Sequence, residues 1–361
     1  MIKLRSNCKM VKNSRYISAA NFPGFSRRSK GMIAALLGLL LFAAPAAMQA
    51  QYGYSTNTDG SIYTYSTNTD GSVTINAYAG PPWDVIIPTN INGLLVTGIG
   101  ESAFFNSASL TSVTIPGTVA SIGYSAFGSC LSLSNVTMAD GVTSIGDSAF
   151  EFCSSLGNVT IPASVTNIGL TVFVYCQSLT SIMVDANNLF YSSTNGVLFD
   201  YSQTTLVEYP GGLAGSYTIP DGVTSIGQEA FYDCSSLTNV TIPGSVATIG
   251  DDAFGGCTGL TSVIIPDGVT SIGQDAFYFC ASLASVTIPG SVTSLGNHAF
   301  EYCSSLTSVI IPDGVTSIGD SAFFSCPSLT NVMISGTVTS IGLTVFAYCQ
   351  SLTSIAVDAS N

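Results

Sequence analysis

Apolar and polar positions follow one another along this chain in a pattern that repeats every 23 residues. A Phe marks each unit, with an aliphatic residue five positions before it, Gly four before, Leu six after, and Val or Ile nine after. A unit this short cannot bury its apolar face alone, so successive units must stack as coils of a solenoid. The marking residues are Phe104, Phe127, Phe150, Phe173, Phe231, Phe254, Phe277, Phe300, Phe323 and Phe346.

One unit indicates which elements each coil should contain. The β-branched residues before Pro312 favour a strand that the proline ends, and Asp313-Gly314 supplies a turn. Residues 315–319 indicate a second, shorter strand, and residues 320–326 indicate a helical turn that Asp or Ser can cap. The pattern therefore predicts a right-handed α/β solenoid of ten 23-residue coils, each with short parallel strands and one short helical turn.

Two stretches depart from the repeat. Residues 51–95 alternate polar and apolar positions around Asp-Gly turns, which predicts a β-meander that caps the first coil. Their Asn-Thr-Asp-Gly-Ser runs resemble calcium loops but lack the full ligand spacing, so we interpret them as turns. The step from Phe173 to Phe231 holds an insertion of 35 residues, and Asn195-Gly196 within it is a hairpin signal. This insertion should project from one coil or extend it.

The N-terminal segment has the composition of an export signal. Residues 1–30 carry all eight Lys and Arg of the chain, an apolar run from Met32 to Ala44 follows, and small residues continue through Ala50. This order is typical of a secretory signal peptide, with cleavage expected after Ala50 or, second, after Ala46. The alternative is an uncleaved anchor, but an apolar run of about 13 residues is short of the roughly 20 that span a bilayer.

These features divide the chain into five segments. They are a basic lead with signal peptide (residues 1–50), a β-meander cap (51–95), leucine-rich coils (96–184), a hairpin-containing insertion (185–220) and further leucine-rich coils (221–361).

Charge excludes several classes of partner. Without the lead, the chain has no Lys or Arg and keeps 21 Asp and Glu with one His, for a net charge near −21. Such a chain cannot neutralise phosphates, so nucleic acid is excluded, and anionic membrane surfaces repel it. We expect no membrane insertion after signal cleavage. Because no carboxylate has a basic partner in this part of the chain, nearly all of them should face water.

The motif Leu-x-x-Val-x-Ile-Pro-x-x-Val-x-x-Ile-Gly-x-x-Ala-Phe-x-x-Cys resembles the BspA-type leucine-rich repeat of bacterial surface proteins. The resemblance covers about 265 residues and includes the irregular unit Asn195-Gly196-Val197-Leu198-Phe199. It implies a secreted or surface-bound bacterial interaction protein, in some members an adhesin for host matrix proteins. That family function has no residue motif, so no binding residue can be transferred.

Nine cysteines recur three positions after the marking Phe, and Cys8 lies in the lead. No Cys-x-x-Cys occurs, so the usual zinc spacing is missing. We expect free thiols that pack as small apolar groups, with disulfides between neighbouring coils as the alternative. The nine are Cys130, Cys153, Cys176, Cys234, Cys257, Cys280, Cys303, Cys326 and Cys349.

Two surface columns are candidate binding sites. One lies on the strand face, where Thr and Asn recur between inward positions, and solenoids commonly bind through such a face. The other is a ridge of aromatic residues two positions after the marking Phe. These side chains either pack around the short helical turn or form a partly exposed ridge able to stack on sugar rings or to contact a protein. The strand-face residues are Thr114, Thr137, Thr160, Thr241, Thr287, Asn135, Asn158 and Asn239, and the ridge residues are Phe152, Tyr175, Phe279, Tyr302 and Tyr348.

Stacking of coils would also align Asp275, His298 and Ser321, the residue types of a nucleophilic triad. No oxyanion hole or cleft accompanies them, so we expect no enzyme activity, cofactor or metal. The sequence predicts a protein that binds a protein partner or mediates adhesion. The alternatives are a structural envelope component and a carbohydrate-binding module. We also expect self-association through the last coil, around Phe346, because no polar cap follows it.

Overall fold

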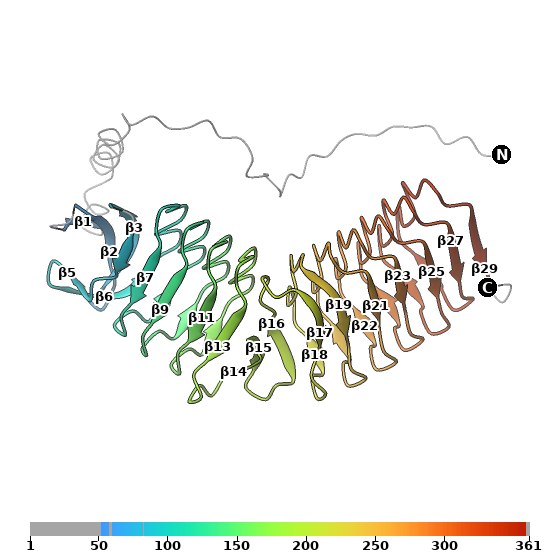
Figure 1. Ribbon diagram of the computed structural model, residues 1–361, viewed down its shortest axis with the longest axis horizontal. Coiled ribbons are helices and arrows are strands. Elements are labelled where there is room, and N and C mark those ends of the chain that lie inside the picture. Colours follow the sequence, from blue (N-terminus) through green and yellow to red (C-terminus); the bar gives the residue numbers. More distant parts are fainter. Residues whose placement is uncertain (1–51, 58–59, 82, 359–361) are drawn as a thin grey trace. The chain divides into compact units, whose positions relative to one another are not determined.

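The computed structural model describes residues 52–57, 60–81 and 83–358. The proposed basic lead, the signal peptide and Cys8 lie outside these residues. The described part is a β-solenoid whose coils stack one beside the next, each with a longer and a shorter strand (Figure 1). Within it, no helix is present, and hence none long and apolar enough to cross a bilayer.

The longer strands form the first side of the solenoid. They pair in parallel within four separate sheets. Equivalent residues of consecutive coils are aligned, so that Val113 lies beside Val136 and Val240 beside Val263. Alternate side chains point into the core, because successive residues of a strand face opposite ways. The longer strands are β4 (Asp84–Ile86), β7 (Ser112–Ile115), β9 (Asn135–Met138), β11 (Asn158–Ile161), β13 (Ser181–Val184), β17 (Gly215–Thr218), β19 (Leu237–Thr241), β21 (Ser262–Ile264), β23 (Ser285–Thr287), β25 (Ser308–Ile311), β27 (Asn331–Ile334) and β29 (Ser354–Val357).

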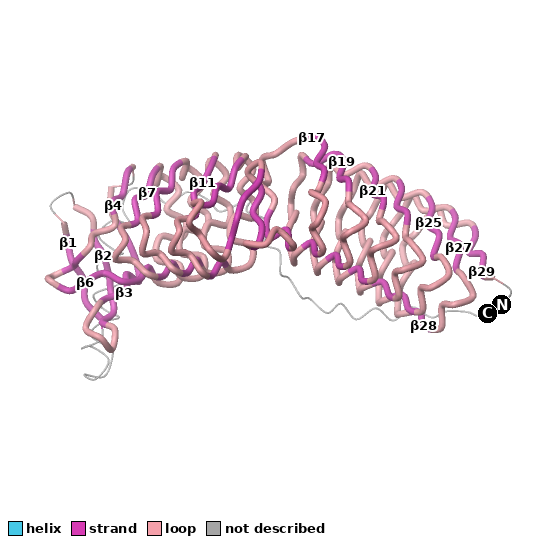
Figure 2. The backbone as a smooth tube through the Cα atoms, turned by 90° about the horizontal axis from the view of Figure 1, so that it is seen from below, coloured by secondary structure: helices cyan, strands magenta, loops and turns pink. Residues whose placement is uncertain are grey.

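The shorter strands form a second side and are also parallel (Figure 2). Each is two residues long and ends in the aliphatic residue that precedes the repeat Gly, which is buried in all of them except Ile168, which is half-buried, and Ile341, which is exposed. They are β8 (Ser121–Ile122), β10 (Ser144–Ile145), β12 (Asn167–Ile168), β18 (Ser225–Ile226), β20 (Thr248–Ile249), β22 (Ser271–Ile272), β24 (Ser294–Leu295), β26 (Ser317–Ile318) and β28 (Ser340–Ile341).

The prediction of one helical turn in each coil is wrong, because the described residues contain no helix. The fold is therefore a β-solenoid and not an α/β solenoid. Residues 320–326 show the reason. Ser321 and Ser325 both have φ near +55°, a left-handed conformation that an α-helix cannot contain. Alternate backbone N–H groups donate to a residue outside the segment. The N–H of Phe323 donates to Val345 O on the next coil at 3.0 Å, whereas the N–H of Phe324 donates to Ser321 O within the segment at 2.9 Å. This segment, a bend between two coils' strands, is therefore held by hydrogen bonds to the next coil as well as by hydrogen bonds within itself.

The repeat Phe side chains stack through the core as predicted. Neighbouring rings lie 4.7 to 5.6 Å apart within each run. The apolar positions of one repeat are buried, as expected, and at most 2 % exposed: Ile249, Phe254, Leu260, Val263 and Ile265. A Tyr begins each run in place of Phe: Tyr78 lies 4.8 Å from Phe104, and Tyr209 lies 4.9 Å from Phe231.

The insertion does not project from a coil, contrary to one of the two forms predicted. Its antiparallel strands β14 (Tyr191–Thr194), β15 (Val197–Asp200) and β16 (Thr205–Glu208) begin the second sheet of shorter strands, with β16 parallel to β18. Val197, Leu198 and Phe199 are all fully buried. Leu198 packs in the core of the preceding coils, whereas Val197 and Phe199 pack in the core of the following coils. Strand β15 therefore lies between two hydrophobic cores and contributes side chains to both.

The N-terminal stretch contains the meander expected there. β1 (Tyr52–Thr56), β2 (Ile62–Thr67) and β3 (Val73–Ala79) are antiparallel, and β3 continues in parallel into β6 (Leu94–Ile99), which β5 (Asn90–Ile91) joins as a hairpin. Strand β4 already pairs with β7 in the sheet of longer strands, so the first coil overlaps the predicted cap. The Asn68–Ser72 segment is a hydrogen-bonded turn, as predicted.

The nine repeat cysteines are free and buried, which confirms the thiol interpretation. Each Sγ lies against a backbone carbonyl of the preceding coil; Cys280 Sγ, for example, is 3.1 Å from Phe254 O. Burial raises the pKa of Cys130 to about 12 and that of Cys303 to about 12. The reactive thiolate is therefore suppressed at these two positions. A hydrogen bond with Cys326 instead lowers the pKa of Cys349, in the last coil.

The repeat Gly sets how closely coils approach. A Cβ on Gly296 would lie 2.3 Å from Gly273 O, whereas a Cβ on Gly244 would meet nothing within 4 Å. We predict that Gly296→Ala lowers the free energy of unfolding by about 1–3 kcal/mol, because the backbone must move. Gly244→Ala should leave stability equal or raise it by up to about 1 kcal/mol. Urea denaturation of both variants checks this, and equal stability of the two would contradict it.

Candidate binding surface

The predicted Thr column lies on the outward face of the longer strands. Thr137, Thr160, Thr241 and Thr287 are exposed, and Thr114 is half-buried. Each stands between two residues whose side chains point into the core, because the strand alternates.

The Asn column lies beside the Thr column on the same face. Asn135 and Asn158 are exposed and Asn239 is half-buried. Each precedes its Thr by two residues, so both side chains point the same way. The structure thus brings both columns to one surface, and their role in binding stays a prediction.

Exposed aliphatic residues interrupt the Thr column, and the repeat pattern alone did not single them out. Thr160 pairs with Met183, and Ile264 lies between Thr241 and Thr287. In the last coils Ile310 and Met333 occupy the column in succession. The exposed fractions of these aliphatic side chains run from 47 % at Met183 to 71 % at Ile264. The signal was readable, because each occupies the repeat position that Thr holds elsewhere.

The aromatic ridge forms two groups. Phe152 and Tyr175 stack with centroids 4.2 Å apart and ring planes 6° apart, and Tyr232 meets Tyr175 edge-on at 6.1 Å across the insertion. In the second group, Phe279 and Tyr302 lie 6.3 Å apart. The chain of contacts continues from Tyr302 to Phe324 and then to Tyr348, at 5.9 and 5.0 Å.

All five ridge residues have a left-handed backbone, with φ between 54° and 62°. This conformation costs a bulky side chain on the order of 1–3 kcal/mol. Other coils hold residues at the same position that adopt it more easily, such as Asn106 and Gly256. Aromatic residues at this position are therefore unfavourable for the backbone, which favours a role for the rings. Phe152, Phe279 and Tyr348 are exposed, whereas Tyr175 and Tyr302 are half-buried.

The surroundings of the ridge are acidic. Glu151 and Glu301 each precede a ridge residue, and the described residues contain no Lys or Arg. Burial raises the pKa of Glu151 and of Glu301; hydrogen bonds from Ser148 and His298, respectively, oppose the shift. The expectation that nearly all carboxylates face water is wrong for Glu208 and Glu301, each 9 % exposed. A partner of this surface meets negative charge.

The row of Asp275, His298 and Ser321 does not assemble as a triad. His298 Nδ1 contacts Glu301 Oε2, and Ser321 Oγ is 2.8 Å from Thr344 Oγ1 on the next coil. Ser321 therefore bonds away from the imidazole.

The last coil exposes apolar side chains on more than one side. Ile341, Leu343 and Val357 are each more than half exposed, as is Tyr348 of the ridge. Self-association through this coil stays a prediction.

The coil geometry and the repeat motif agree with one known family. The family described as BspA type leucine rich repeat region matches residues 85–207 and 224–353. The chain belongs to this family.

Solved structures of bacterial leucine-rich repeat proteins match this chain, and the two with TM-scores above 0.5 show the shared fold. The pneumococcal vaccine antigen PcpA is 19 % identical with a TM-score of 0.57, over 85 % of this chain and 89 % of that one. A leucine-rich repeat protein from Eubacterium ventriosum is 24 % identical with a TM-score of 0.55, over 85 % and 91 %. A leucine rich cell surface protein from Faecalibacterium prausnitzii is 27 % identical with a TM-score of 0.44, over 86 % and 96 %. The search of curated proteins found no match.

Proposed function

We propose that this BspA-type repeat protein is exported, stays at the cell surface or is secreted, and binds a protein partner through the outward face of its longer strands. Its role is binding or adhesion, not catalysis. Export is supported by the order of basic, apolar and small residues before Gln51. The mass of the N-terminal peptide from the extracellular fraction tests it, with Gln51 as the expected first residue.

The exposed aliphatic residues in the Thr column carry the proposal. Ile264, Ile310 and Met333 are all more than half exposed on a regular sheet face. Exposed apolar side chains rimmed by polar ones are typical of protein–protein contact sites, and Met is enriched at such interfaces. Sugars and inorganic surfaces gain little from aliphatic side chains, which favours a protein over a carbohydrate or a passive envelope role.

Carbohydrate binding is the second candidate function, and one observation favours it. Phe152 and Tyr175 form a stacked aromatic pair in which the Phe152 ring is exposed, and exposed aromatic side chains are groups on which sugar rings can stack. The two functions thus use different surfaces and can be separated by mutation.

The test compares two variants on a panel of immobilised extracellular matrix proteins and polysaccharides. Ile264→Thr/Ile310→Thr/Met333→Thr places in the column the residue that it holds elsewhere, so the fold should be kept. Phe152→Asn/Tyr175→Asn removes the ring pair with a residue that tolerates the left-handed backbone. We expect the triple variant to lose binding to a matrix protein by about tenfold or more, while the ring-pair variant keeps it.

Loss of polysaccharide binding in the ring-pair variant alone would support the second candidate function. Wild-type affinity of the triple variant for every protein ligand would contradict the choice of the strand face. Circular dichroism of both variants confirms that each is folded.

A further inference from the structure

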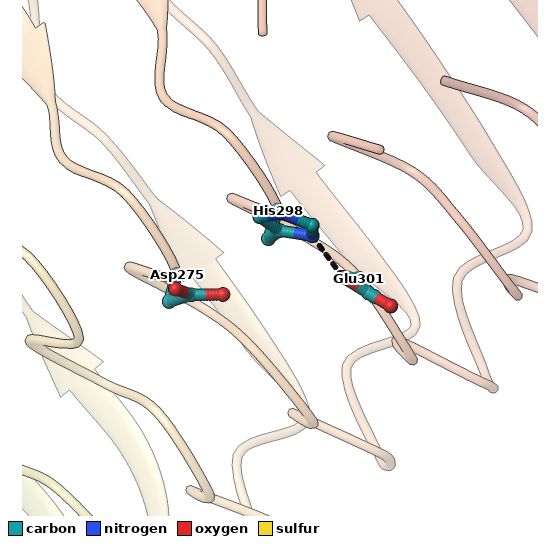
Figure 3. A group of neighbouring side chains, drawn as sticks. All are labelled: Asp275, His298 and Glu301. Atoms are coloured by element: carbon teal, nitrogen blue, oxygen red, sulfur yellow. Dashed lines mark hydrogen bonds and ion pairs between the residues drawn. The ribbon is translucent and has the colours of Figure 1, made fainter. Parts of the chain in front are cut away.

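We propose that Asp275, His298 and Glu301 form a binding site for a divalent transition-metal cation such as Zn²⁺. Each residue offers one ligand atom, and the three atoms lie within 4.8 Å of one another. Figure 3 shows the side chains side by side on neighbouring bends, with the His298 ring against Glu301 and the Asp275 carboxylate directed toward them.

The repeat itself builds this cluster. Asp275 and His298 occupy the same position of consecutive coils, two residues before Phe277 and Phe300, so the stacking of coils places one beside the other. Their bends are held by backbone bonds to the next coil: the N–H of Asp275 donates to Asn297 O at 2.9 Å.

Glu301 reaches the same point through its own turn. Its N–H donates to His298 O at 3.0 Å, which closes a turn and brings the carboxylate beside the imidazole. Three ligand atoms therefore come from two adjacent coils, on backbone that inter-coil hydrogen bonds hold in place. Such preorganisation lowers the ordering cost of binding a metal ion.

The residue types suit a transition metal better than calcium or magnesium. Zn²⁺ is bound by imidazole nitrogen and carboxylate oxygen in sites of four ligands, one of which is often water. Calcium and magnesium take six or more ligands, nearly all of them oxygen. The three side chains leave one of four positions for water or a ligand from a partner.

The negative charge around Asp275 and Glu301 favours binding of a cation at this cluster. Glu301 is 9 % exposed, and the described residues contain no Lys or Arg that could neutralise it or Asp275. His298 is the only His in the whole chain, so the cluster has no counterpart on the other coils. The corresponding positions one coil earlier hold Asp252, Asp275 and Tyr278, whose side chains contain no nitrogen that could bind a metal.

The experiment titrates the purified, metal-free full chain with Zn²⁺ by calorimetry and with Co²⁺ by visible absorption. We expect one Zn²⁺ per chain, with Co²⁺ giving a four-coordinate spectrum without a sulfur-to-metal charge-transfer band. His298→Asn suits the left-handed backbone of this position, where φ is 58°. It should weaken Zn²⁺ binding by more than about tenfold, because even groups that only orient a ligand change affinity about 10–100-fold. Glu301→Gln should have an effect of the same size.

The control variant Asp267→Asn removes one negative charge from an exposed turn. Its Zn²⁺ affinity should equal that of the wild type. Equal affinity of wild type and His298→Asn would overturn the site and show that Zn²⁺ binds diffusely to the acidic surface. A cobalt–sulfur band that persists in His298→Asn would instead assign the metal to cysteines and would equally overturn it. The result does not depend on the proposed partner, because the probe is the metal alone.

Discussion

Phe254→Ala should lower the free energy of unfolding by about 3–5 kcal/mol. Phe254 is fully buried, and its ring stacks between Phe231 at 4.7 Å and Phe277 at 5.1 Å. Truncation removes the ring from both neighbours and leaves a cavity that the backbone cannot close, because inter-coil hydrogen bonds fix the spacing of the coils. Guanidinium denaturation followed by circular dichroism measures the loss.

A matched control is available on the surface. Phe105 is 53 % exposed, so Phe105→Ala makes the same chemical change outside the core. It should change stability by about 0.5 kcal/mol or less. A loss below about 1 kcal/mol for Phe254→Ala, or equal losses for the two variants, would contradict the role of the Phe stack.

The protein should become less stable as the pH rises from about 5 to 8, and Glu208 should be the main cause. Burial raises the pKa of Glu208 to about 8; the N–H of Phe173, which donates to its Oε1 at 3.0 Å, opposes the shift. In the unfolded chain the pKa is about 4.3. The folded state therefore binds an extra proton between these two values. Its stabilising effect is complete below about pH 4.3 and is lost as the pH rises through about 8.

Asp233 should act in the same direction over a narrower range, because burial raises its pKa to about 6. Because Asp233 is only partly buried, solvent screening reduces its share, and Glu208 should supply most of an effect of a few kcal/mol. Urea midpoints measured at a series of pH values between 5 and 8.5 report it.

Glu208→Gln isolates the contribution of this carboxyl. The amide stays neutral and keeps an oxygen for the Phe173 N–H. At pH 8.5 the variant should be more stable than the wild type, and its stability should vary less with pH. Asp221→Asn, on an exposed turn, is the control and should keep the wild-type pH dependence. An unchanged pH dependence in Glu208→Gln would show that Glu208 does not titrate as described.

The sequence predicted those features that recur at a fixed position of the repeat. The inward positions around Phe254, the outward Thr137 and the buried thiol of Cys280 all follow from the 23-residue pattern and the alternation of a strand. The bends could not be predicted in the same way. The run around Phe323 reads as a helix, but its alternate amides bond to the next coil, and sequence propensity does not include that partner.

Among the candidate sites, too, those that repeat along the chain could be predicted, and those that depend on a single residue or a tertiary contact could not. The Thr and aromatic columns were visible because each repeats, whereas Ile264 and Met333 were overlooked because they break a column. The sequence also placed Asp275 and His298 on adjacent coils. It gave no sign that Glu301 would turn toward them, because that contact depends on the turn closed by the Glu301 N–H. Burial of Glu208 likewise depends on the path of the insertion.

Strand β15 has a consequence for how this protein can change length. Because Leu198 faces one core while Val197 and Phe199 face the other, the apolar side chains of this strand divide between the two cores. The hydrogen bond from the Phe173 N–H to Glu208 Oε1 is a buried contact that joins the two sides. A whole coil can be duplicated or deleted on one side while the packing of the other stays the same. The outward faces on the two sides of β15 are thus free to lengthen, shorten and diverge separately within one chain.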